Sequence, residues 1–169
     1  RNPLGYEATQ HLPAMGRHRI LGEYGMDDVR VQVIRELDAP VDTVWAVVSN
    51  FGDVSWAMPP EAKVDVIGEG VGMIRRLHTP GGAVEERLET CDAETRSFSY
   101  SIPGEMPMPV RDFRAWVQLE PLGDARTQVT WNASAKALPG ITGAEGQAIF
   151  EGLYAGLIDA LDAHVTKAA

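Results

Sequence analysis

A long amphipathic helix is expected over residues 142–166, directly after a run of strand patterns. Thr142 and Glu145 form the Thr-x-x-Glu capping box that begins many helices. A helix of roughly 25 residues is about 38 Å long, which is enough to cross a whole sheet. We therefore expect a sheet with this helix lying across it. Its apolar face recurs every four residues, at Ile149, Leu153, Leu157 and Leu161.

Two glycines, Gly152 and Gly156, lie inside this helix. Each costs a helix about 1 kcal/mol relative to alanine. The feature that offsets this cost is either close packing of the helix on the sheet or room for a ligand beside the helix.

Seven segments ahead of the helix carry strand patterns. In the first of them, Val29, Val31 and Val33 alternate with polar residues, as in a half-buried strand. The later connections are too short for parallel crossovers, which favours antiparallel hairpins. The segments are 29–37, 63–68, 73–78, 84–90, 97–102, 110–119 and 127–137.

Two short helices are expected between the first two strands. Pro40 suits a first helical turn, and an apolar face follows in residues 44–48. Residues 51–58 can form a second short helix before Pro59 and Pro60 stop it. The predicted fold class is α+β, with a curved antiparallel sheet of about seven strands around a long C-terminal helix.

The chain has 169 residues, which suits one domain with a sizeable core. We assign this domain to residues 29–169. Residues 1–28 lack sustained periodicity, and we expect them to be an N-terminal arm or tail, either native or foreign to the protein.

Charge and cysteine content exclude several classes of function. The formal net charge is -9, which disfavours nucleic acid and anionic membranes as partners. No apolar run is long enough for membrane insertion. The single cysteine, Cys91, permits no intrachain disulfide and no Cys-based zinc site. A cytoplasmic protein without metal or cofactor is expected, although a secreted protein without disulfides would have the same cysteine content.

Strand alternation places two opposite charges in one interior. Val84 and Leu88 are inward by their apolar character, so Glu86 between them is inward too. On the preceding strand, Arg75 shares the inward parity of Leu77. A buried charge is costly unless it is paired. The two residues are therefore a structural ion pair, a polar anchor for a ligand carboxylate, carbonyl or hydroxyl, or an acid–base pair.

Four motifs, in their order along the chain, resemble the helix-grip superfamily. This group contains the START domains, the birch pollen allergen family, the plant abscisic acid receptors and bacterial proteins described as polyketide cyclase/dehydrase. The resemblance spans roughly residues 29–166 and is more specific for fold than for function. The motifs are VDTVWAVVSNFGDVSWAMP, VEERLETCDAETRSFSYSI, PVRDFRAWVQLEP and TQVTWNASAKALPG.

The resemblance implies a cavity between the long helix and the concave face of the sheet, closed by two loops. The loops match residues 78–82 and residues 103–110. The second is rich in proline and methionine and is expected to be a lid, or else its methionines cap the core. The predicted gate residues are His78, Pro80, Met106 and Met108.

The receptor-like members hold polar ligand contacts at the positions that match Glu86 and Phe113. Apolar alternation points Trp131 inward, whereas the match to the receptors points Asn132 inward, and a bulge could reconcile the two. The predicted ligand-binding residues are Arg75, Glu86, Leu88, Tyr100, Ile102, Phe113, Asn132, Leu153 and Leu157.

The expected partner is a small hydrophobic molecule such as a lipid, polyketide or terpenoid, and a homodimer is left open. The alternative is a polyketide cyclase or dehydratase that folds its substrate in the same cavity. Glu86, Arg75, Tyr100 or His78 would then move protons, although a loop histidine such as His78 is more often simply solvated. A protein-interaction role, such as that of a chaperone activator, is a third reading.

Overall fold

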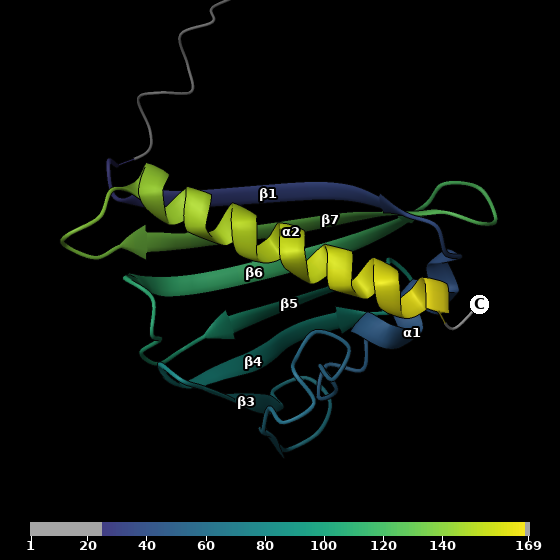
Figure 1. Ribbon diagram of the computed structural model, residues 1–169, viewed down its shortest axis with the longest axis horizontal. Helices are drawn as coiled ribbons and strands as arrows, with labels where there is room; N and C mark the ends of the chain where they lie inside the picture. The colour runs from purple at the N-terminus through teal and green to yellow at the C-terminus, as the bar shows by residue number, and fades with distance from the viewer. Residues whose placement is uncertain (1–24, 168–169) are drawn as a thin grey trace, which may run out of the picture.

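The computed structural model describes residues 25–167, in which a single sheet is covered on one face by the C-terminal helix (Figure 1). The elements in chain order are β1 (Asp28–Leu37), α1 (Val41–Val48), β2 (Val64–Ile67), β3 (Ile74–Thr79), β4 (Gly82–Asp92), β5 (Ser97–Ile102), β6 (Val110–Pro121), β7 (Thr127–Ala137) and α2 (Gly143–Lys167).

The seven strands form one antiparallel sheet in the order β1-β7-β6-β5-β4-β3-β2. β1 and β2 are thus the two edges, and α1 with the following turns connects them across the sheet. The predicted fold class, a curved antiparallel sheet around a long helix, is confirmed. The prediction of a second short helix is wrong, because residues 50–57 form successive i→i+3 turns. Asp53 N donates to Asn50 O, and Ala57 N donates to Val54 O.

The capping box begins α2 as predicted. Thr142 N donates to Glu145 Oε2 over 2.7 Å, and Glu145 N donates to Thr142 Oγ1 over 3.2 Å. At this end the helix lies very close to β1. A Cβ built on Gly143 would be 2.1 Å from Asp28 O, and one on Gly146 would be 2.7 Å from Val29 Cγ2. Glycine at these two positions therefore lets α2 approach the sheet.

The buried face of α2 differs from the predicted one. Ile149 and Leu153 are 43% and 51% exposed, whereas Leu161, at the C-terminal end of the predicted stripe, is fully buried. The helix carries a second apolar stripe, displaced by one residue, and its larger aromatic side chains are the ones buried against the sheet. The core residues of α2 are Phe150, Tyr154, Ile158, Leu161 and Val165.

The domain begins before Val29. Ala137 N donates to Asp27 O over 2.7 Å, and Gly143 N donates to Met26 O over 3.0 Å. Residues 25–28 therefore join the end of β7 to the start of α2. The remainder of the predicted arm, residues 1–24, lies outside the described residues. In residues 25–167, none of the helices combines the length and the apolar character that crossing a membrane requires.

Candidate functional site

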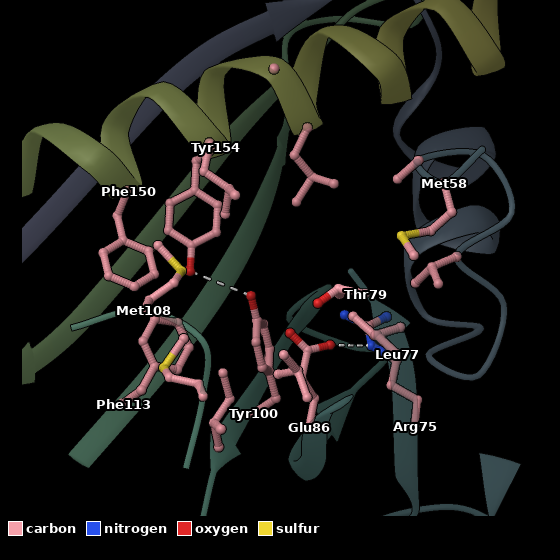
Figure 2. A pocket seen from close by; sticks show the side chains of 18 of the residues that line it. Met58, Arg75, Leu77, Thr79, Glu86, Tyr100, Met108, Phe113, Phe150 and Tyr154 are labelled. Atoms are coloured by element: carbon pink, nitrogen blue, oxygen red, sulfur yellow. Dashed lines mark hydrogen bonds and ion pairs between the residues drawn. The ribbon is translucent and has the colours of Figure 1, made fainter. Parts of the chain in front are cut away.

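A pocket of about 460 Å³ lies between α2 and the inner face of β3–β7, beside the turns that follow α1 (Figure 2). A pocket of this size is ample for a small-molecule ligand. Most of the predicted site residues line it. These are Arg75, Glu86, Tyr100, Ile102, Phe113, Leu153 and Leu157 of the binding set, and Met106 and Met108 of the gate set.

Arg75 and Glu86 form a buried ion pair in the pocket wall. They are direct cross-strand partners on β3 and β4, and Arg75 Nε donates to Glu86 Oε2 over 2.5 Å (Figure 2). Arg75 Nη1 also donates to Phe51 O over 2.9 Å, and its guanidinium carbon lies 4.0 Å from the centre of the Phe51 ring. The side chains of Arg75 and Glu86 are 10% and 11% exposed. The pair thus ties two strands to the turn after α1, and both of its members remain in the wall.

Two tyrosine hydroxyls meet across the pocket, Tyr100 from β5 and Tyr154 from α2. Their oxygens are 3.5 Å apart (Figure 2). Burial raises the pKa of the Tyr100 hydroxyl above its ordinary value, and the charge of Glu86 raises it further. Burial is also the main cause that raises the pKa of Tyr154. Both groups therefore stay protonated at neutral pH, where they are hydrogen-bond donors and poor proton acceptors.

Trp131 on β7 brings an unsatisfied donor to the same place. Its ring stacks on Tyr154 with centres 5.4 Å apart, and the residue is 2% exposed. Its Nε1 has no hydrogen-bond partner within the described part of the chain. The Trp131 indole offsets part of the rise in the pKa of both tyrosines, although no hydrogen bond of acceptable geometry joins its N–H to either hydroxyl. An unpaired buried N–H is costly, so a ligand acceptor would be favoured here.

Phe113 lines the pocket next to a bulge in β6. Arg111 pairs with Lys136 and Arg114 pairs with Ser134, so two β6 residues oppose one residue of β7. Asp112, inside the bulge, has φ 56, a left-handed backbone conformation. Phe113 shares the inward side of β6 with Ala115, and the bulge lets Val110, three residues earlier, be buried as well. The Phe113 ring stacks on Phe150 of α2 with ring centres 5.2 Å apart.

The two predicted mouth loops touch each other. A Cβ built on Gly81 would lie 3.0 Å from Pro107 Cβ, so the β3–β4 turn packs against the loop between β5 and β6. Met106 and Met108 are half-buried, line the pocket and also pack on the core. Both interpretations of these methionines are therefore compatible with the geometry.

The two gate residues of the first loop do not line the pocket. Leu77 and Thr79 line it, so by strand alternation His78 points to the other face. There His78 Nε2 lies 2.8 Å from Asp65 Oδ2. Pro80 is exposed at the turn and does not line the pocket either. Thr79 takes the place predicted for these two residues.

Two further predicted contacts lie elsewhere. Leu88 is inward and 3% exposed, but it belongs to the packed core and not to the pocket wall. Asn132 is on the outer face, where its Oδ1 accepts a hydrogen bond from Gln32 Nε2. β7 keeps an unbroken register with β1, so apolar alternation holds, and Trp131 is the inward residue. The bulge that could have reconciled the two assignments is in β6.

Several pocket residues were missed at the sequence level. The signal for Phe150 and Tyr154 was an aromatic pair four residues apart, one position away from the stripe that was chosen. Gly156 also lines the pocket, and a Cβ built on Gly152 or Gly156 would meet nothing within 4 Å. Close packing therefore does not explain these two glycines, and at Gly156 the open space is pocket.

The fold and the pocket define a helix-grip domain, in which a curved antiparallel sheet wraps around a long C-terminal helix. Residues 28–166 match the family described as polyketide cyclase / dehydrase and lipid transport. The chain belongs to this family, whose helix-grip fold binds hydrophobic ligands.

Solved structures share this fold at low sequence identity. An uncharacterised protein from Bacillus thuringiensis is 22% identical, with a TM-score of 0.70 over 82% of this chain and 99% of that one. Norcoclaurine synthase from Thalictrum flavum, in complex with dopamine and hydroxybenzaldehyde, is 19% identical, with a TM-score of 0.67 over 90% and 98%. The ZhuI aromatase/cyclase from Streptomyces sp. R1128 is 20% identical, with a TM-score of 0.67 over 83% and 94%.

Proposed function

We propose that this protein binds a small, largely apolar molecule in the pocket between α2 and the sheet, and that an oxygen of this molecule accepts a hydrogen bond from Trp131. The observation that carries the proposal is the buried, unpaired Nε1 of Trp131 beside the hydroxyls of Tyr100 and Tyr154. The other walls are mainly aliphatic and aromatic, which suits the body of such a ligand.

A matched pair of tricyclic probes tests the oxygen anchor. Fluorenone and fluorene differ by one carbonyl oxygen, and both can compete with the neutral fluorescent probe N-phenyl-1-naphthylamine. A hydrogen bond of about 0.5–1.5 kcal/mol predicts that fluorenone binds roughly 2- to 12-fold more tightly. Trp131→Phe should abolish this preference, because it removes the N–H and keeps a ring.

Trp116→Phe is the control, since Trp116 is 44% exposed on the outer face. It should leave the preference unchanged. Equal affinity of the wild-type protein for the two probes would contradict the oxygen anchor. Failure of both to displace the fluorescent probe would contradict binding in this pocket. Native mass spectrometry of the purified protein then gives the mass of any ligand that it retains.

The loop of residues 103–110 is proposed to be a lid. Met106 and Met108 supply adaptable apolar surface to the pocket, and prolines flank them. Replacing both methionines with serine should speed release of N-phenyl-1-naphthylamine several-fold and leave the melting temperature of the empty protein nearly unchanged. Glu105→Ser, in the same loop but outside the pocket, should not alter release.

Hydrogen exchange gives the second measurement of the lid. The amides of the non-proline residues within 103–110 should exchange more slowly when the probe is bound. Identical exchange with and without the probe would reduce the loop to a stiff hairpin whose methionines only cap the core.

Catalysis in the same pocket is the second candidate, favoured by the position of Glu86. Its carboxylate lies in the wall within reach of a bound molecule, and the two tyrosines could hold a substrate oxygen. Structural relatives include an aromatase/cyclase and a synthase. A retained ligand that is recovered unchanged after incubation supports carriage, whereas conversion that depends on Glu86 supports an enzyme.

A further inference from the structure

A row of alternating arginine and serine crosses the outer face of the sheet, opposite α2. The register pairs Arg87 with Ser101, Ser101 with Arg114, Arg114 with Ser134, and Ser134 with Arg30. These strands, β4-β5-β6-β7-β1, are neighbours in the sheet (Figure 1). Strands are spaced about 4.8 Å apart, so successive arginine positions in the row are roughly 10 Å apart with a serine between them.

One end of this row lies in a groove of about 440 Å³, separate from the pocket between α2 and the sheet. Arg87, Ser101 and Arg114 line it, and Arg111 joins them from the same strand as Arg114. Residues 103–105 close one side of the groove, whereas residues 106–108 of the same loop line the pocket on the other face. The chain as a whole carries a net charge of -9, whereas three arginines and two acidic residues, Glu105 and Asp112, line this groove.

The three guanidinium groups are not equally engaged. Arg87 Nε donates to Glu89 Oε1 over 2.9 Å, and Arg111 is paired with Asp112. Arg114 makes no hydrogen bond or ion pair to any residue between 25 and 167. The pKa of Glu89 is lowered by hydrogen bonds from Ser101 and Arg87, and the charge of Arg114 adds to this effect. Arg114 thus lines the groove with its donors available.

We propose that this groove is a binding site for an oxyanion, specifically the phosphate or diphosphate group of a soluble small molecule. Arg114 is its central contact, and Arg87 and Arg111 flank it. The planar guanidinium group matches two oxygens of a phosphate at once.

The acidic side chains around the groove do not prevent this binding. Glu105 and Asp112 line it, and Glu89 contacts Arg87 and Ser101. The ion pairs of Arg87 and Arg111 are exposed, with side chains 45% and 56% accessible on the arginine side. Exposed pairs of this kind contribute only about 0–1 kcal/mol, so a doubly charged phosphate can displace their carboxylates.

The test is an NMR titration of the ¹⁵N-labelled full chain with inorganic pyrophosphate, and separately with inorganic phosphate, at constant ionic strength. We expect saturable shifts of the amides of residues 101, 102, 104, 105 and 111–114, with tighter binding of pyrophosphate. Arg114→Gln should weaken binding at least tenfold and leave the melting temperature unchanged, because the side chain is exposed and unpaired.

Arg35→Gln is the charge-matched control. Arg35 is an exposed arginine of β1 outside the groove, and its Nη1 donates to Ile34 O. It should leave the affinity unchanged. Shifts that never saturate, or an equal loss of affinity in the Arg35 and Arg114 variants, would overturn the site and leave only nonspecific attraction between charges.

Discussion

Replacing Glu86 with leucine is expected to cost about 3–5 kcal/mol of the free energy of unfolding, the range found when one partner of a buried ion pair is removed. Arg75 would remain buried with the Phe51 carbonyl as its one hydrogen-bond acceptor and no counter-charge. Urea denaturation of the purified variants measures the loss. The double variant Arg75→Met, Glu86→Leu should recover most of it, since apolar residues then replace the whole pair.

The same two strands supply a matched control. Arg76 and Glu85 are also direct cross-strand partners, and Arg76 Nη2 lies 2.5 Å from Glu85 Oε1. Their side chains are 38% and 41% exposed. Glu85→Leu should therefore cost less than about 1 kcal/mol. Equal losses in the Glu85 and Glu86 variants would mean that burial does not set the strength of this pair.

The inward positions of Arg75 and Glu86 could be predicted because they depend only on strand alternation. The apolar Val84 and Leu88 show which side chains of β4 point inward. The antiparallel pairing of β3 with β4 then places Arg75 opposite Glu86. The capping box of Thr142 and Glu145 is likewise a local signal, and it forms as expected. Local rules thus sufficed for the strands and for the start of α2.

The rest of the site depends on contacts between distant segments, which periodicity does not contain. α2 has two apolar stripes, and only the packed sheet selects the one with Phe150 and Tyr154 over the one with Ile149 and Leu153. The bulge at Asp112 contains no glycine that would indicate it in the sequence, although it lets both Val110 and Phe113 be buried. Asn132 was misplaced because the match to distant relatives was weighed above the apolar alternation of its own strand.

The polar character of the pocket follows from the same packing. Tyr100 comes from the centre of the sheet, Tyr154 from the helix and Trp131 from another strand, so the three residues are far apart in the sequence. Only the folded chain brings their hydroxyl and indole groups together. The unpaired Nε1 of Trp131 is therefore a property of the fold that the sequence alone could not indicate.

Filling the pocket from α2 gives the largest expected effect on binding. A Cβ on Gly156 would meet nothing within 4 Å, and Gly156 lines the pocket, so Gly156→Leu directs a side chain into the space proposed for the ligand. Overpacking costs about 1–3 kcal/mol, which corresponds to roughly a 5- to 150-fold rise in the Kd of N-phenyl-1-naphthylamine. The empty protein should be at least as stable as the wild type, because leucine favours the helix over glycine by up to about 1 kcal/mol.

Gly152→Leu is the control on the same helix. Gly152 is exposed, a Cβ there also meets nothing within 4 Å, and the residue is outside the pocket wall. This variant should gain helix stability and bind the probe with wild-type affinity. Fluorescence titration and thermal denaturation of both variants, side by side, separate occlusion of the pocket from a general effect on α2. Unchanged probe affinity in Gly156→Leu would show that the ligand does not occupy the space beside this helix.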